Sequence, residues 1–151
     1  MPSPVFTLTN SASSVISSLS YGNIDAGSAS APTQVYFWNN FGGSTAISDA
    51  INVTLTTKTY NGLDSGDTVQ NGQEVVTGLS FAEQCISQGD VGYTSIGGPT
   101  TAGIGSAAGG EGTIQGVTGG DAAIVNLTLS APANVTPGQV QFLMRLNYSY
   151  V

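Results

Sequence analysis

The chain has 151 residues, of which 7% are charged, and its formal net charge is -7. Nucleic acids and anionic membranes are excluded as expected partners, because both require clusters of basic side chains and the only cations here are Lys58 and Arg145. Histidine is absent and Cys85 is the only cysteine, so the common catalytic triads, imidazole metal sites and zinc clusters are missing, and we expect neither enzymatic activity nor a cofactor.

Strands are the elements that the sequence predicts, and they begin near the N-terminus. Phe6 and Leu8 indicate a first strand, and the region from Leu19 to Asn39 indicates further strand structure that includes the apolar run Val35–Trp38. Apolar and polar residues then alternate with period two in residues 51–59, 123–129 and 140–150. Asn-Gly and Pro-Gly turns separate these segments, which predicts an all-β sandwich or barrel formed by one domain over residues 1–151.

The segment that begins at Ser80 permits two interpretations. Ser80 and Glu83 have the spacing of a capping box, which would open a short helix through Ile86. Phe81 and Cys85 instead fit the apolar face of a strand. Both interpretations remain open at the level of sequence.

Glycine is dense between Gly89 and Gly120, and this density weakens any regular element. We therefore predict a long Gly-rich loop or insertion over residues 89–120. Such loops inside compact domains are usually functional or disordered. Because this polar segment keeps Ile104 and Ile114, a further hypothesis is that a neighbouring subunit orders it.

The N-terminus lacks the basic and apolar regions of a secretion signal, and no apolar run reaches the length of a membrane span. We expect neither a signal nor a span. Cys85 cannot form an internal disulfide, which fits assembly inside a cell. No cation lies near it in sequence to activate its thiol, so we expect a small buried side chain.

An acidic segment supplies the candidate metal ligands. Asp64, Asp67 and Glu74 offer the oxygen ligands that Ca²⁺ prefers, although they lack EF-hand spacing. The same residues fit two solvated hairpin tips closed by Asn-Gly turns, which is the favoured interpretation.

Aromatic residues offer a candidate contact surface made of Tyr36, Trp38, Phe41 and Tyr60. Such residues provide large amphipathic contact areas, so they could form a platform for sugars, or they could pack in the core. In a strand, Trp38 lies on the face opposite Val35 and Phe37. A subunit interface would cover it there.

The region from Leu19 to Gly42 has a recognisable pattern. A leucine precedes the Tyr21-Gly22 pair and Ile24, then come Gly27 and serine, then alternating apolar residues that end in asparagine and glycine. This pattern resembles immunoglobulin-like domains of the abnormal-spindle and hydin type. The resemblance implies an immunoglobulin-like antiparallel β-sandwich, with Tyr21 and Ile24 anchored on its core, that serves as a binding or scaffolding module without catalytic residues.

Scarce charge with abundant glycine, serine and threonine also resembles bacteriophage virion proteins, especially head-decoration and tail components. We therefore expect a structural virion protein of a tailed bacteriophage, such as a capsid decoration or cement protein, that is assembled in the host cytoplasm. Its expected partners are itself, as a homo-oligomer for which a trimer is one candidate, and a capsid or tail protein lattice. The alternative is an extracellular adhesion or carbohydrate-binding module. The interface candidates are Trp38, Phe41, Ile104, Ile114, Tyr148 and Tyr150.

Overall fold

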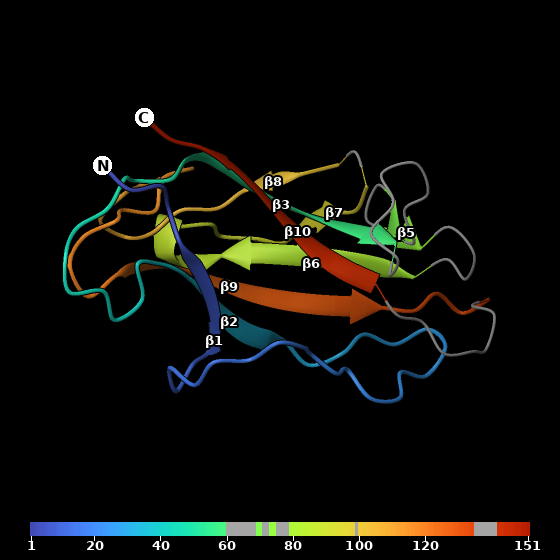
Figure 1. Cartoon of the computed structure of the whole chain (residues 1–151). Coiled ribbons are helices and arrows are strands. Elements are labelled where there is room, and N and C mark those ends of the chain that lie inside the picture. The colour runs from blue at the N-terminus through green and yellow to red at the C-terminus, as the bar shows by residue number, and fades with distance from the viewer. Residues whose placement is uncertain (60–68, 71–72, 75–78, 99, 135–141) are drawn as a thin grey trace.

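The computed structural model describes residues 1–151 except 60–68, 71–72, 75–78, 99 and 135–141. Its regular elements are strands and one short 3-10 helix, and no α-helix lies in the described part of the chain. Two antiparallel sheets face each other across one hydrophobic core (Figure 1). The predicted all-β sandwich is therefore confirmed.

The larger sheet contains seven strands, all paired antiparallel. Its strand order is β1 (Phe6–Asn10), β2 (Thr33–Asn39), β9 (Asp121–Ser130), β6 (Ser80–Cys85), β5 (Gln73–Glu74) and β4 (Val69–Gln70), with β7 (Thr94–Ile96) also paired to β6.

The smaller sheet contains three strands in the order β10 (Phe142–Ser149), β3 (Ile51–Thr59) and β8 (Ala102–Gly103). β3 and β10 pair antiparallel along their length, with a register shift between Asn147 and Ser149. β10 is one of the two outer strands of this sheet, and it crosses in front of β6 in Figure 1.

Alternate residues of the long strands fill the space between the two sheets. Val125 and Leu127 of β9 are fully buried from one side, and Val53 and Leu55 of β3 are fully buried from the other. Each such side chain contributes about 1.5–3 kcal/mol when it is removed from water. The period-two pattern therefore predicted the correct faces in these strands.

Strand β6 resolves the two interpretations of the segment that begins at Ser80. Phe81, Glu83 and Cys85 are buried, whereas the residues between them are partly exposed, which is strand alternation. β9 on one side and β7 on the other satisfy its main chain. A helix at Ser80 is therefore wrong. The only helix among the described residues is η1 (Ile86–Gln88), and no helix found there is long and apolar enough to cross a membrane.

The Gly-rich segment is not the uninterrupted loop that its composition predicted. It contains β7 and β8, and Ile104 and Ile114 are both 0% exposed in the core of the chain itself. The main chain of Ile114 exchanges hydrogen bonds with Ala50 just before β3. Intrachain contacts therefore account for its burial, and the burial of these isoleucines requires no neighbouring subunit.

Close approach of backbones explains glycine at two positions in this segment. A Cβ on Gly105 would lie 1.9 Å from the carbonyl oxygen of Gly110. A Cβ on Gly116 would lie 2.3 Å from the carbonyl oxygen of Ile47. Glycine here permits tight packing, since no larger residue fits without backbone movement.

The region from Leu19 to Pro32 differs from the predicted strand. Regular structure begins only at Thr33, and the residues before it form an irregular crossing segment. Tyr21 and Ile24 nevertheless pack against the core, and the Tyr21 ring meets Phe81 edge to face at 6.0 Å. Gly22 has a φ of +63°, a conformation that glycine adopts without strain.

Candidate functional site

Three of the predicted platform aromatics gather on the outer face of the larger sheet. Tyr36 and Trp38 alternate with buried residues of β2, and their rings stack at 6.1 Å. Phe41 follows β2 and lies 5.0 Å from Trp38. The Trp38 indole N–H donates to the Thr9 hydroxyl at 2.9 Å, which fixes the ring. Tyr60 lies outside the described residues. We call Tyr36, Trp38 and Phe41 the aromatic cluster.

The strand positions beside the aromatic cluster carry no charge. Trp38 pairs across strands with Ala122, and Tyr36 pairs with Ile124. Farther along the same face, the Gln34 amide donates to Asn126 at 3.2 Å and the Asn126 amide donates to Gln84 at 3.4 Å. Neutral hydrogen bonding and ring stacking are therefore the interactions that this face can offer.

A second group of aromatics lies where β10 ends beside the start of β1. The rings of Phe6 and Tyr148 are 4.8 Å apart, and those of Tyr148 and Tyr150 are 6.4 Å apart. Tyr148 is 40% exposed, Tyr150 is 51% exposed, and Leu143 on the same strand is 40% exposed. Leu143 lies on the outward-facing side of the strand, apart from the tyrosines. We call Tyr148 and Tyr150 the β10 patch.

The six interface candidates therefore divide into two kinds. Tyr148 and Tyr150 are exposed, and Trp38 and Phe41 are half-buried on an outer surface. Ile104 and Ile114 have no exposed surface, so the chain itself uses them and they are corrected from interface residues to core residues. Composition could not distinguish a core residue from an interface residue, since an isoleucine in a glycine-rich segment suits either role.

Hydrogen-bond direction in the smaller sheet determines what the outer edge of β10 presents. The Val53 main chain bonds to Ile104 and Gly112, on the side of β3 away from β10. Directions alternate along a strand, so Thr56 faces β10 and bonds to its cross-strand partner Arg145. Phe142, Met144 and Leu146 of β10 consequently direct their main-chain N–H and C=O groups away from β3, toward the outer edge of the sheet. No described residue forms a main-chain hydrogen bond with them.

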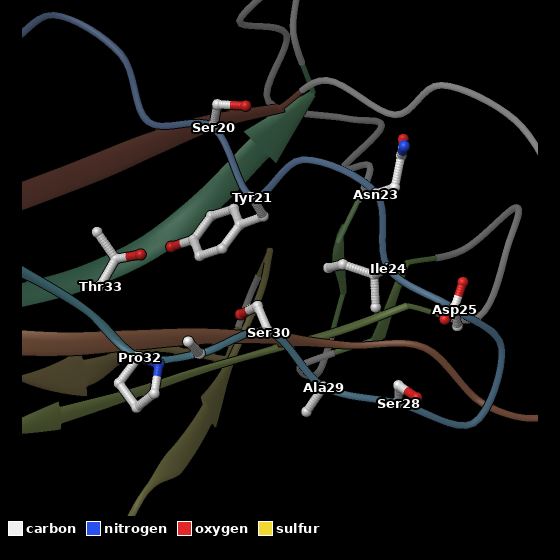
Figure 2. Close-up of a pocket in the computed structure, with 11 residues that line it drawn as sticks. Ser20, Tyr21, Asn23, Ile24, Asp25, Ser28, Ala29, Ser30, Pro32 and Thr33 are labelled. Atoms are coloured by element: carbon white, nitrogen blue, oxygen red, sulfur yellow. The ribbon is translucent and has the colours of Figure 1, made fainter.

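A hollow of about 440 Å³ lies inside the irregular crossing segment (Figure 2). The lining side chains are mostly hydroxyl-bearing or small, and Asp25 is the only ionisable carboxylate among them. In Figure 2 the Tyr21 hydroxyl is directed toward that of Thr33, yet this buried oxygen has no hydrogen-bond partner in the described structure. Burial raises the pKa of Tyr21, and the Thr33 side chain lowers it in part.

Apart from the Asp25 carboxylate, the side chains that line this hollow offer neutral hydrogen bonds and apolar contacts. No basic side chain lines it, so it offers no counter-charge to an anionic ligand. The Tyr21 ring packs on Phe81, and Ser30 uses its hydroxyl to accept the Leu129 N–H at 3.0 Å. Its polar groups therefore serve partly to hold the crossing segment against the sheets.

Glu83 is a buried acid that the sequence suggested only as part of a capping box. It is 1% exposed, and one of its carboxylate oxygens has no hydrogen-bond partner. Burial, and secondarily the charge of Asp90, raises the Glu83 pKa to about 7. Asp90 is held by the Cys85 N–H at 3.1 Å and the Gln88 amide at 3.0 Å. The sequence signal that could have predicted this buried acid is the position of Glu83, which shares the inward face of an alternating strand with Phe81 and Cys85.

Cys85 is fully buried, as its sequence neighbourhood predicted. Its thiol donates to the carbonyl oxygen of Gly105 at 3.3 Å. Burial raises the pKa of the Cys85 thiol, with hydrogen bonds from its surroundings opposing the rise. The neutral thiol is therefore favoured over the reactive thiolate.

Ser106 and Asp121 form another buried polar pair. The Ser106 hydroxyl donates to the Asp121 carboxylate and accepts the Gly109 N–H at 2.9 Å. These bonds tie the Gly-rich segment to the start of β9.

The calcium candidates fall mainly outside the described residues. Asp64 and Asp67 belong to residues 60–68, and Glu74 ends β5. Where the structure describes side chains, it brings together no group of three residues that could hold a metal ion. The calcium hypothesis therefore stays a prediction.

Comparison of the chain with protein-family models gives no match, and comparison with curated proteins finds no relative.

Proposed function

We propose that this chain is a structural protein that binds copies of itself and a protein lattice, such as a decoration or cement component on the capsid of a tailed bacteriophage. The single observation that carries this proposal is the open edge of β10 next to the exposed β10 patch. Interfaces in stable assemblies are depleted in charge and enriched in aromatic residues, as this strand is. Binding only the assembled lattice would stabilise it by mass action.

We further propose that the domain is immunoglobulin-like and of the abnormal-spindle and hydin type. Taken in chain order, β1, β2, β3, β6, β9 and β10 occupy the positions of strands A to F in an immunoglobulin domain. Sheet order β1-β2-β9-β6 then corresponds to A-B-E-D, and the β10-β3 pair corresponds to F-C. This correspondence supports a binding module, since the strand G position beside β10 is open among the described residues.

Light scattering and co-sedimentation test the lattice proposal. We expect the purified chain to form oligomers as its concentration rises, and to sediment with capsid particles whose genes neighbour its own. Replacing Tyr148 and Tyr150 together by serine should weaken capsid binding at least about tenfold, because loss of buried aromatic anchors typically costs more than 1 kcal/mol. Val91→Ser is the control, since Val91 is fully exposed elsewhere.

Two results would contradict the lattice proposal. One is a monomer at every concentration that also fails to sediment with capsid or tail particles. The other is equal loss of binding in the tyrosine variant and in Val91→Ser, which would make the β10 patch no different from any exposed apolar surface.

The aromatic cluster favours a second candidate, a carbohydrate-binding module. Its rings, together with the uncharged amide row of Gln34, Asn126 and Gln84, suit neutral sugars. A glycan array distinguishes the two functions. Binding that Trp38→Ala abolishes and Tyr148→Ser leaves unchanged would support sugar recognition, whereas an array without signal would reject it.

A further inference from the structure

Among the described residues, the outer edge of β10 has little of the protection that edge strands usually have. Natural edges are blunted by short length, lysine, proline, bulges or a covering segment. β10 has 8 residues, contains neither lysine nor proline and carries one charged residue, Arg145. Its register with β3 shifts only at the far end, between Asn147 and Ser149, where the extra residue lies on β3. The stretch from Phe142 to Leu146 is therefore a regular edge with outward N–H and C=O groups.

β1, one of the two outer strands of the larger sheet, is covered by the chain itself. The chain turns back after β1 and runs along its outer edge. The Ile16 N–H donates to Leu8 at 3.0 Å, and the Asn10 N–H donates to Ser14 at 3.0 Å. This contrast shows that the chain covers the edge of β1 by itself, whereas no described segment covers the edge of β10.

We propose that the β10 edge pairs antiparallel with the β10 edge of a second copy of this chain, so that two three-stranded sheets join into one. This inference deepens the proposed function and rests on it for the existence of an oligomer. The pairing is strand addition across a twofold axis, in which the same edge serves both partners.

The apolar pattern of β10 matches that of the strand required beside it. Phe142, Met144 and Leu146 face the core but are only half-buried. A strand added at this edge must continue the apolar row with the same period, and a second β10 does so.

Charge also favours a second copy at this place. The chain has a net charge of -7, so two copies repel each other over most of their surfaces. β10 contains no acid, and its one charged residue is Arg145. A contact between two β10 strands therefore brings no pair of acids together, unlike contacts over most of the surface.

Like-charge repulsion selects the register. Pairing centred on Arg145 would place the two arginines directly opposite each other, which is destabilising. Pairing centred on Met144 sets Arg145 across from the partner's Leu143 and uses only the regular stretch from Phe142 to Leu146. In this register the two Met144 residues exchange both of their main-chain hydrogen bonds.

Two substitutions of Met144 isolate the edge hydrogen bonds. Met144→Ala and Met144→Pro both remove the long side chain, but only proline also removes the outward N–H, and edge strands tolerate proline at such a position. We expect Met144→Pro to weaken dimerisation roughly 10- to 100-fold relative to Met144→Ala, because each copy loses an interface donor. Light scattering gives the dimerisation constant, and circular dichroism shows that both variants fold.

The outcomes separate this inference from the proposed function. If the wild-type chain forms oligomers and both folded variants associate equally, the β10 edge is not the contact, while the lattice proposal stands. If the wild-type chain stays monomeric at all concentrations but sediments with capsids, self-pairing is overturned and the edge receives a strand of another protein. If it does neither, both proposals fail.

Cysteine crosslinking tests the register in the same dimer. Directly opposite hydrogen-bonded residues have Cα atoms about 5.5 Å apart, within disulfide range. Met144→Cys should therefore crosslink under mild oxidation, whereas Leu146→Cys should not, since it faces the partner's Phe142. Crosslinking by Leu146→Cys alone would overturn the Met144-centred register. Buried Cys85 in the wild-type chain provides the background.

Discussion

At the scale of single residues, Glu83 shows how position overrides side-chain chemistry. Strand alternation points it into the core between Phe81 and Cys85, where one carboxylate oxygen lacks a partner. Burying a charge without a partner is costly, so the folded protein favours the neutral acid. The pKa of Glu83 consequently rises from 4.5 to about 7.

This shift predicts a pH dependence of stability. Between pH 4.5 and about pH 7 the folded chain keeps a proton on Glu83 that the unfolded chain has released. The folded state therefore binds more protons, and its free energy of unfolding falls as the pH rises through this window. Glu83→Gln should remove this fall and raise the melting temperature at pH 8 by roughly 2–4 °C relative to wild type.

Thermal unfolding at pH 5 and pH 8 measures the effect. Glu111→Gln is the matched control, because it removes the same charge from an exposed position. A Glu83→Gln melting curve that keeps the pH dependence of the wild type would mean that another group causes it.

At the scale of elements, the Gly-rich segment packs as part of the sandwich. Its glycines permit backbone contacts that exclude a side chain, while its isoleucines fill the core. The Ile104 N–H donates to Val53 at 3.0 Å, and the Val53 N–H donates to Gly112 at 2.9 Å, so the segment continues the hydrogen bonding of β3. High glycine content here reflects close packing.

A pair of glycine substitutions tests this packing. Gly105→Ala should lower the free energy of unfolding by about 2–4 kcal/mol, because its Cβ would overlap the carbonyl oxygen of Gly110. Gly92→Ala should change it by less than about 0.5 kcal/mol, because nothing lies near that Cβ. Urea unfolding compares the two, and an equal, small effect would mean that the segment is a loop that tolerates side chains.

At the scale of the whole molecule, the low charge content and the negative net charge bear on the proposed self-association. Few charges leave the surface able to pack against neighbours, yet the net charge of -7 opposes the approach of identical copies. The contact proposed through β10 would avoid this opposition, because β10 carries no acid.

Salt should therefore strengthen self-association. Raising sodium chloride from about 0.02 M to about 0.5 M shortens the screening length well below 10 Å and should tighten the dimer several-fold. A variant with Asp25→Asn and Glu111→Gln, which has two fewer negative charges on exposed positions, should show a smaller salt effect. Sedimentation velocity gives the constants, and weakening by salt in the wild type would indicate that ion pairs hold the oligomer instead.

The sequence by itself determined the all-β class, the faces of the long strands and the burial of Cys85, because alternation and local charge are read over a few residues. It also indicated that Trp38 lies on the face opposite Val35, where the aromatic cluster is found. The helix considered at Ser80 was wrong, because this segment pairs with neighbouring strands. The strand expected from Leu19 begins only at Thr33, because the residues before it are held by core contacts instead of by strand pairing.

Only the tertiary structure decided which residues meet across the sandwich. Ile104 and Ile114 belong to the core because residues 104–114 pack beside β3, and no local pattern encodes that contact. That no described strand pairs with the outer edge of β10 likewise depends on strand order, since every strand carries the same main-chain groups until its neighbours are known. Long-range pairing therefore decides which edges of the described sheets have a neighbour.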